Sequence, residues 1–380
     1  MEFKILKQSK KSRARLGILK TAHGEVETPT LVTVATQAVV KTLTAEEAVS
    51  VKSPMLICNT YHLHERPNEK IVARAGGLHQ FMNWSGPLMT DSGGFQVFSF
   101  GFGRDLGVGK MVKYFPGQTP NQVEQNSKPA FVKISPDGVI FKRSNGDKEF
   151  LGPKESIKIQ EKLGADIIFA FDECTPPLAT YDYVKGSLER THTWAKICRQ
   201  VHHRKDQALF GIVQGSRYLD LREASAKFID ALDFPGFGIG GDLGLDKKEM
   251  GKIIEFTLKF LPNHKPRHLL GIGYLEDIET AFELGIDTFD CTVPTQYARH
   301  GAAFTSAGRL DLRKKKFLTS KLPLDKKCEC PVCGTYRLNY LAHLIQAREI
   351  TGLKLLTLHN LYFFNTFVER LRQKVKNDLY

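Results

Sequence analysis

Short runs of apolar and β-branched residues recur through the first 300 residues, and amphipathic stretches separate most of them. Within each run the apolar residues are continuous instead of alternating, as in strands that are buried on both faces of a parallel sheet. The intervening stretches, such as PKESIKIQEKLG and LREASAKFIDAL, place their apolar residues at helical spacing. The expected strands lie at 31–36, 54–60, 87–92, 166–173, 208–215, 236–241, 268–273 and 288–295.

Eight buried strands that alternate with helices predict an α/β fold of the (β/α)8 TIM-barrel type. Such a barrel usually takes about 250 residues, so we expect residues 1–300 to form one catalytic barrel domain. A doubly wound open sheet is the alternative. It explains less, because no G-x-G-x-x-G motif follows the first strand.

Further segments decorate the expected barrel. Residues 3–28 predict an N-terminal hairpin that covers the bottom of the barrel. The stretch VKISPDGVIFKRSNGDKEFLG predicts a second hairpin between the third and fourth strands, because Asp-Gly and Asn-Gly favour tight turns. Before it, residues 101–131 are rich in Gly, Pro, Gln and Asn and predict a mobile loop over the site. The inserted loop and hairpin together occupy 101–151.

The chain carries 54 Lys and Arg against 41 Asp and Glu, a formal net charge of +13. This surplus indicates a polyanionic partner, most simply a nucleic acid. Residues 299–327 hold nine Lys or Arg and two Asp. Such a run is often only a solvated face, but this one leads directly into a cysteine cluster, which favours a phosphate-binding surface. The candidate contacts are Arg299, Arg313, Lys314, Lys315 and Lys316.

No apolar run reaches the roughly 18 residues that a membrane span needs. The N-terminal sequence MEFKILKQSKKSRARLG is basic but lacks the apolar region of a signal peptide. We therefore expect a cytoplasmic protein with reduced thiols and no membrane association. Seven cysteines, an odd number in a long chain, do not indicate a disulfide framework.

Three of the seven cysteines form a Cys-x-Cys-x2-Cys motif in DKKCECPVCG. Close-set thiolates in a reducing compartment most often bind Zn²⁺, which takes four nitrogen or sulfur ligands. Spacing alone leaves two candidates for the fourth ligand: His343, in an apolar helical pattern, and His359, which we favour. Four protein ligands would close the site, so the zinc is expected to be structural. Residues 301–380 thus predict a basic zinc-binding subdomain with a C-terminal helix. The cysteines are Cys328, Cys330 and Cys333.

Polar residues and glycines cluster where the expected strands end. In a (β/α)8 barrel the catalytic groups belong at these ends. One Asp there could simply cap a helix, but three on one rim make a purely structural explanation improbable. No histidine falls convincingly at the rim. The strand-end residues are Asn59, Thr60, Asp91, Ser92, Asp172, Glu173, Cys174, Gln214, Gly240, Gly241 and Asp290.

Several carboxylates around one cavity suit chemistry at an anomeric carbon, with one as nucleophile and another as general acid and base. A retaining glycoside hydrolase would satisfy that pattern. The edge of guanine, however, offers two donors and one acceptor, which Asp172, the Gln214 amide and the Gly241 N–H would match, while Phe95 could stack on the base. Together with the basic surface, these residues predict base exchange or excision in a nucleic acid.

The motifs MTDSGGFQVFS, AFDECTP, GIVQG, DCTVPT…ARHG and C-x-C-x2-C…H resemble the tRNA-guanine transglycosylase family over essentially the whole chain. The resemblance implies a (β/α)8 barrel with a zinc subdomain that usually acts as a homodimer. It also implies that the guanine at the tRNA anticodon wobble position is replaced by a free 7-deazaguanine base, preQ1 or queuine, on the route to queuosine.

Residue roles follow from the same resemblance. Asp290 would be the nucleophile and Asp91 the general acid and base. Phe95 and Leu270 would sandwich the base. The other base-binding residues would be Asp91, Ser92, Asp172, Gln214 and Gly241, and the zinc ligands would be Cys328, Cys330, Cys333 and His359.

Some positions depart from the family pattern. Phe95 stands where the family usually has Tyr, and Gln296 stands where it usually has Arg. The stretch GGDLGLD replaces GGLAVGE, so Gly244 is expected to leave room for a large 7-substituent and Asp242 to add a carboxylate. Gln296 and the long 101–131 segment are the only support for an alternative, a relative that acts on DNA. A non-catalytic RNA-binding subunit is a further alternative, although such a subunit would not need both catalytic aspartates.

Overall fold

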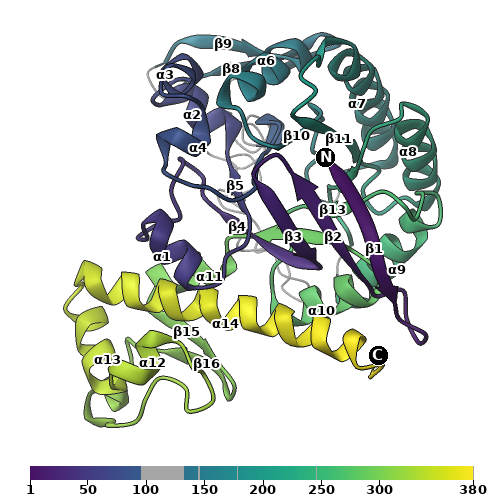
Figure 1. Cartoon of the computed structure of the whole chain (residues 1–380). Coiled ribbons are helices and arrows are strands. Elements are labelled where there is room, and N and C mark those ends of the chain that lie inside the picture. Colours follow the sequence, from purple (N-terminus) through teal and green to yellow (C-terminus); the bar gives the residue numbers. More distant parts are fainter. Residues whose placement is uncertain (96–131, 144–145, 178, 245, 380) are drawn as a thin grey trace.

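The computed structural model describes residues 1–95, 132–143, 146–177, 179–244 and 246–379. At its centre, eight parallel strands form a closed barrel in the order β10-β11-β12-β13-β14-β4-β5-β6 (Figure 1). Pairing of β14 with β4, from Thr288 opposite Thr30 to Cys291 opposite Thr33, closes the ring. The predicted (β/α)8 fold is therefore confirmed. The strands are β4 (Thr30–Val34), β5 (Leu56–Cys58), β6 (Leu88–Thr90), β10 (Ile167–Phe169), β11 (Ala208–Val213), β12 (Phe237–Ile239), β13 (Arg267–Leu269) and β14 (Thr288–Cys291).

The barrel interior is a packed apolar core. Every residue of β6, β10, β11 and β12 is buried, which explains why these strands appear in the sequence as continuous apolar runs. Inside the ring, Phe169 and Phe210 meet edge to face with their ring centroids 5.7 Å apart. Each fully buried side chain of this size stabilises the fold by roughly 1.5–3 kcal/mol. Because the interior is filled, a substrate can only meet the barrel at its rims.

Helices cover the outside of the barrel, and local signals fix where several of them begin. Thr44 and Glu47 form a reciprocal capping box at the start of α1, and the Asp246 side chain accepts from Glu249 N at 2.8 Å to start α9. No described helix has the length and apolar content needed to cross a membrane. The barrel helices are α1 (Ala45–Ser50), α2 (Thr60–Glu65), α3 (Glu69–Arg74), α4 (Leu78–Phe81), α6 (Pro153–Leu163), α7 (Tyr181–Val201), α8 (Leu219–Ala231), α9 (Lys247–Leu258), α10 (Leu275–Glu283) and α11 (Val293–Arg299).

A three-stranded antiparallel sheet, in the order β1-β2-β3, covers the N-terminal end of the barrel (Figure 1). The expected hairpin over 3–28 is corrected here, because β2 turns back a second time and pairs with β3 as well as β1. Leu19 and Val26 belong to the same buried cluster as the barrel interior, so burial of this apolar face holds the third strand in place. The strands are β1 (Glu2–Gln8), β2 (Arg15–Thr21) and β3 (Gly24–Thr28).

Between β6 and α6 lies a second small antiparallel sheet of β7 (Val132–Ser135), β8 (Gly138–Lys142) and β9 (Lys148–Leu151). The expected hairpin is therefore present, with one strand more than a hairpin has. The long loop expected over 101–131 lies outside the described residues.

The C-terminal part packs beside the barrel and shares its longest helix with it. Its own core gathers side chains from the elements between α11 and the start of α14. From there α14 runs back along the barrel, where Phe364, Val368 and Leu371 join the main core (Figure 1). The elements are β15 (Ala302–Thr305), β16 (Gly308–Asp311), a 3-10 helix (Lys315–Thr319), α12 (Pro331–Thr335), α13 (Leu338–Gln346) and α14 (Ile350–Lys376).

Candidate active site

Residues from six barrel strands meet at the C-terminal rim. The predicted substrate-binding and catalytic residues at this rim lie in the last residues of a strand or within a few residues after it. Because the strands are parallel, their C-terminal ends open on the same face. These positions are Asp91 after β6, Asp172 after β10, Gln214 after β11, Gly241 after β12, Leu270 after β13 and Asp290 in β14.

Asp91 is held by donors from the end of the neighbouring strand β5 and from its own segment. Thr60 N and Gly93 N each donate to Asp91 Oδ1 at 3.0 Å, and the Asn59 amide donates to Oδ2. Burial raises the pKa of Asp91 to about 7, and the charge of nearby Asp290 also acts to raise it, against the lowering effect of the donors. Near neutral pH this carboxyl is populated in both protonation states, as a group that both gives and takes a proton requires.

Asp172 forms a buried polar cluster with two of the other predicted base-binding residues. Ser92 Oγ donates to Asp172 Oδ1 at 3.1 Å, and Gln214 Nε2 donates to Oδ2 at 2.7 Å. Burial raises the pKa of Asp172 to about 6, these two donors lower it, and the charge of Glu173 raises it. Above that pH the group is a carboxylate, which can only accept hydrogen bonds.

The Gln214 amide lies flat against two glycines. A Cβ at Gly241 would lie 2.3 Å from Gln214 Oε1, and a Cβ at Gly240 would lie 3.0 Å from Gln214 Nε2 and 3.3 Å from Leu270 Cδ1. Any side chain at Gly241 would therefore displace the amide. Gln214 Oε1 is buried and has no hydrogen-bond partner among the described residues, so its capacity to accept a hydrogen bond is unused. Phe95 is half-buried and lies four residues after Asp91, where the chain has already become helical.

Asp290 has two partners, and the sequence indicated neither of them. Gly271 N donates to Asp290 Oδ1 at 3.0 Å, and His268 Nε2 lies 3.2 Å from the same oxygen. His268 is fully buried, and its other ring nitrogen lies 2.9 Å from Thr288 Oγ1. The sequence places His268 at the start of an expected strand, far from the C-terminal end where catalytic groups are expected. Only the pairing of β13 with β14, in which His268 lies opposite Thr288, brings the ring to Asp290.

Arg222 is a second functional neighbour that the sequence did not reveal, because it looks like an ordinary position of an amphipathic helix. Its buried guanidinium donates to Ser216 O at 2.7 Å, to Gly240 O at 2.8 Å and to Asp242 O at 3.1 Å. Burial lowers the pKa of Arg222 to about 10. The side chain thereby connects the loops that follow β11 and β12. These loops carry Gln214 and Gly241, so Arg222 helps to hold both residues in place.

The space expected at Gly244 is filled. A Cβ there would lie 2.5 Å from Glu249 Cγ, and the glycine has a φ of +102°. Asp242 caps this turn by accepting from Gly244 N at 3.0 Å, and it also lies 3.5 Å from Arg217. Glycine is therefore required at position 244 by the positive φ and by close packing against Glu249 of α9. The expectation that Gly244 leaves space in the pocket is corrected, because Glu249 fills that space.

Three cysteines and one histidine converge in the C-terminal part. Their potential ligand atoms all lie within 4.8 Å of one another, with sulfur-to-Nδ1 distances to His359 of 3.8, 3.4 and 3.3 Å. Edges of about 3.6 Å are expected between sulfur and nitrogen around a tetrahedral zinc. His359 Nε2 lies 2.7 Å from Phe304 O and donates to it, which leaves Nδ1 free for a metal. His343 is exposed on α13, away from the cluster, whose cysteines are Cys328, Cys330 and Cys333.

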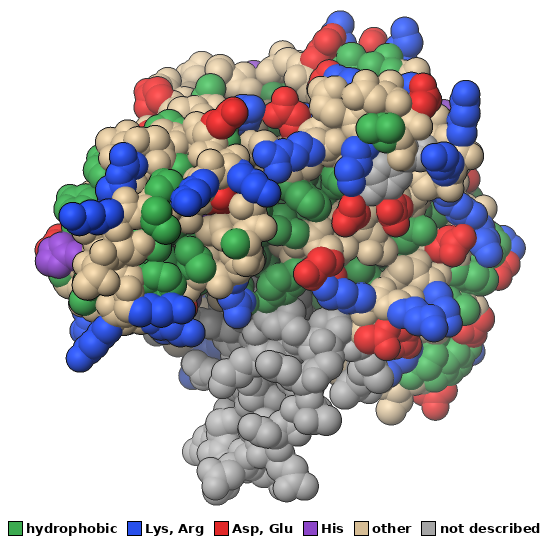
Figure 2. Space-filling model, turned by 90° about the horizontal axis from the view of Figure 1, so that it is seen from below, with side chains coloured by type: hydrophobic (Ala, Val, Ile, Leu, Met, Phe, Trp, Pro, Cys, Tyr) green, Lys and Arg blue, Asp and Glu red, His purple; other side chains and the backbone are tan. Residues whose placement is uncertain are grey.

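The predicted RNA-binding residues lie on the C-terminal part or next to it. Figure 2 shows Lys and Arg side chains gathered with few acidic ones over the half of this face where the C-terminal part comes forward. Arg313 is exposed but pairs with Asp311 at 2.8 Å. Arg299 is partly buried in α11. No described carboxylate forms an ion pair with the exposed lysines of the run, Lys314, Lys315 and Lys316.

Comparisons with known proteins identify the family. The family model described as Queuine tRNA-ribosyltransferase matches residues 9–114 and 117–380. The chain is 43% identical over 380 residues to the queuine tRNA-ribosyltransferase of Halothermothrix orenii, covering all of this chain and 94% of the relative. It is 45% identical over 379 residues to the protein of the same name from Staphylococcus aureus strain JH9, covering 99% of this chain and 93% of that relative.

Proposed function

This chain belongs to the queuine tRNA-ribosyltransferase family, and from that premise we propose that its barrel rim exchanges a base in tRNA through a covalent ribosyl intermediate. The protein is a glycosyltransferase of the tRNA-guanine transglycosylase type that acts in queuosine modification. The assignment of steps to residues rests on one observation, the meeting of Asp91 and Asp290 at the same rim with different surroundings.

Asp290 is suited to attack the ribose. Both of its contacts, from Gly271 N and His268 Nε2, are made to Oδ1, and no described residue hydrogen-bonds to Oδ2. One oxygen is therefore held in place while the other remains available. The Oδ2 atom attacks C1′ of the target guanosine, the C1′–N9 bond breaks, and its electron pair leaves with guanine.

Asp91 supplies the proton that the leaving guanine needs, because its pKa of about 7 keeps a protonated fraction at neutral pH. The resulting carboxylate then takes a proton from the incoming 7-deazaguanine. That base attacks C1′ from the face that guanine left, the bond from C1′ to Asp290 breaks, and the aspartate is released unchanged. Two displacements retain the anomeric configuration.

The base is bound by the cluster around Asp172. Each Asp172 oxygen has one donor within the protein, Ser92 or Gln214, and a second lone pair on each can accept from the base. Gly241 supplies a backbone N–H to the base carbonyl, beside the Gln214 amide. Phe95 and Leu270 form the walls that stack on the base.

Zinc is the metal that fits the Cys328, Cys330, Cys333 and His359 cluster. Three sulfurs and one imidazole nitrogen match its preferred donors, and four protein ligands leave no position for a substrate, so its role is structural. The hydrogen bond from His359 Nε2 to Phe304 O orients the ring for the metal through Nδ1.

The nucleic-acid partner is tRNA, and the anticodon wobble guanine is the proposed target. Arg299, Arg313, Lys314, Lys315 and Lys316 are the proposed phosphate contacts. The proposal also includes that the protein is cytoplasmic and that it acts as a homodimer. The names of both relatives favour tRNA over DNA, and the pair of aspartates favours an enzyme over a non-catalytic subunit or a polysaccharide hydrolase.

A trapping experiment tests the assignment. The parent protein, incubated with unmodified tRNA and a guanine analogue that cannot be ribosylated, should give a covalent protein–tRNA band on a denaturing gel. Asp290→Asn should bind tRNA with parent affinity but give no band. Asp91→Asn should bind tRNA and exchange labelled guanine at least about 100-fold more slowly, as expected for loss of a general acid.

The assignment is wrong if Asp290→Asn still forms the covalent band while another aspartate variant does not. Labelled guanine offered with unmodified tRNA or with duplex DNA separates the nucleic-acid alternatives in the same assay.

A further inference from the structure

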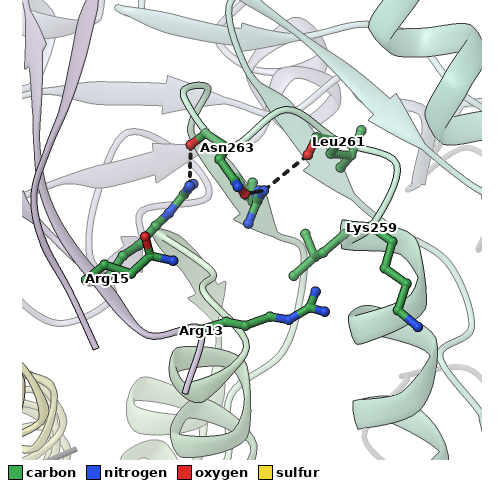
Figure 3. A pocket seen from close by; sticks show the side chains of 8 residues that line it. Arg13, Arg15, Lys259, Leu261 and Asn263 are labelled. Carbon is green, nitrogen blue, oxygen red and sulfur yellow. Dashed lines mark hydrogen bonds between the residues drawn. The ribbon is translucent and has the colours of Figure 1, made fainter. Parts of the chain in front are cut away.

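A pocket of about 360 Å³ lies at the opposite, N-terminal end of the barrel (Figure 3). Its walls come from the start of β2, the segment that precedes it, the loop after α9 and the start of β13. Arg267 begins β13, whereas Leu270 at the active site follows the other end of the same strand. The packed barrel interior therefore separates this pocket from the base-exchange site.

Four cationic side chains line the pocket, and no carboxylate does: Arg13, Arg15, Lys259 and Arg267. In Figure 3 the Arg13 guanidinium extends across the pocket on the side of Lys259, and Arg15 reaches up to Asn263. A volume of this size lies within the range of small-ligand sites, which begins near 300 Å³.

The carboxylates nearby neutralise only part of this charge. Arg15 donates from Nε to Asp287 Oδ1 at 2.8 Å, so that pair is balanced. Arg13 lies 3.7 Å from Glu255, a pair in which both side chains are more than two-fifths exposed and which is therefore weak. Lys259 is exposed, and the described ion pairs include none that it makes.

Arg267 is the unusual member, because it is only 3% exposed and forms no direct ion pair among the described residues. Its Nη2 donates to Asn263 Oδ1 at 2.7 Å and to the Leu261 carbonyl at 3.3 Å. Its Nε is buried without a hydrogen-bond partner among the described residues. Burial and the charge of Arg15 lower the pKa of Arg267 to about 10, while the charge of Asp287, the carboxylate already paired with Arg15, acts to raise it. A buried guanidinium kept beside another cation is costly unless an anion compensates for it.

We propose that this pocket binds a phosphate-class oxyanion, either inorganic phosphate or the terminal phosphate of a small phosphate ester. Arg13 and Lys259 provide the exposed donors that would contact it, while Arg15 and Arg267 supply the fixed positive charge behind them. The site is independent of the base-exchange chemistry and of the basic surface at Lys314–Lys316.

Isothermal titration with inorganic phosphate, and separately with a ribonucleoside 5′-monophosphate, tests the proposal at constant ionic strength. The parent protein should bind at one saturable site. The double variant Arg13→Gln and Lys259→Gln changes two exposed side chains, so it should fold, and it should bind at least tenfold more weakly. Preference for the nucleotide over phosphate would identify an ester as the ligand.

A variant with Lys314, Lys315 and Lys316 changed to Gln is the matched control, and it should bind phosphate as the parent does. Equal binding by the parent and the Arg13/Lys259 variant would overturn the proposal, as would absence of saturable binding. In that case the four cationic side chains have only a structural role, in the packing of β2 and the segment before it against the loop after α9. Exchange of labelled guanine into tRNA should be unchanged in the Arg13/Lys259 variant, so the failure of this proposal is distinct from failure of the proposed function.

Discussion

At the scale of single residues, two carboxyl groups of the rim, one buried and one partly buried, ionise at different pH. Burial raises the pKa of Asp172 to about 6 and that of Asp91 to about 7. In the proposed mechanism Asp172 acts as a carboxylate that accepts hydrogen bonds from the base. Asp91 acts there in its protonated form at the first step, when guanine leaves.

The first prediction concerns pH. The rate of guanine exchange at low tRNA concentration should fall below about pH 6, as Asp172 gains a proton, and above about pH 7, as Asp91 loses its proton. The profile should be bell-shaped, measured with labelled guanine between pH 5 and pH 9. For Asp91→Asn, the fall on the alkaline side should disappear from the residual activity. A profile that rises steadily to pH 9 would contradict Asp91 as the acid.

The second prediction concerns His268, which we infer to be a positioning residue for Asp290. His268→Leu removes one of the two groups that hold Asp290 Oδ1, and a hydrogen bond to a charged group contributes about 1.5–3 kcal/mol. The kcat for exchange should fall roughly 10- to 100-fold, with the KM for tRNA unchanged.

His268→Gln is the matched control, because its amide can still donate to the carboxylate. It should recover much of the lost kcat. If the Gln and Leu variants lose kcat equally, and in proportion to their loss of melting temperature, the histidine is only a packing residue of the barrel core.

At the scale of elements, α14 is the helix that connects the metal cluster to the barrel. It carries His359 and, one residue on, Asn360, whose amide donates to the carbonyls of Pro294 and Ala302 at 3.0 Å each. Pro294 lies in α11, four residues after Asp290. Metal binding at one end of this path should therefore stabilise the backbone that follows Asp290.

The third prediction tests that connection. Cys330→Ala removes one of the four proposed ligands. The zinc content of the purified protein, measured by elemental mass spectrometry, should therefore fall well below one zinc per chain. The melting temperature should fall by at least about 5 °C, because metal binding contributes directly to folding. Cys198→Ala is the control: this cysteine is also buried but lies outside the cluster, so zinc content should stay at one per chain. Full zinc content in Cys330→Ala would refute the site.

At the scale of the whole molecule, the surplus of positive charge is unevenly placed. The chain carries a formal net charge of +13, and the lysines of the 3-10 helix and the residue before it form no described ion pair with a carboxylate. A lysine that contacts a phosphate of a nucleic acid releases counterions, so the number of such contacts appears in the salt dependence of binding.

The fourth prediction uses that dependence. Changing Lys314, Lys315 and Lys316 to Gln should weaken tRNA binding and reduce the slope of log K against log salt by about 2, since each phosphate contact contributes roughly 0.7–0.9. A control with Lys10, Lys20 and Lys205 changed to Gln removes the same charge from exposed positions elsewhere on the chain. Equal slopes for the two variants would mean that Lys314–Lys316 are only a solvated face.

The sequence by itself determined the parts of this protein that depend on local pattern. Strands buried on both faces must be continuous apolar runs, so the order of residues alone locates all eight barrel strands. Cys328, Cys330 and Cys333 lie so close along the chain that their spacing alone indicates a metal site. Asp91 and Asp290 could be placed at one rim because the ends of parallel strands meet there.

Only the tertiary structure decided which distant residues meet. His268 reaches Asp290 through the register of two strands, and His359 reaches the cysteines through the path of α14, while His343 stays exposed. The N-terminal cations meet Arg267 at a pocket that no local pattern marks. These contacts join residues that are 22 to more than 200 positions apart in the sequence. Such contacts depend on how the whole chain packs and how its strands pair, because the conformational preferences of neighbouring residues do not reach that far.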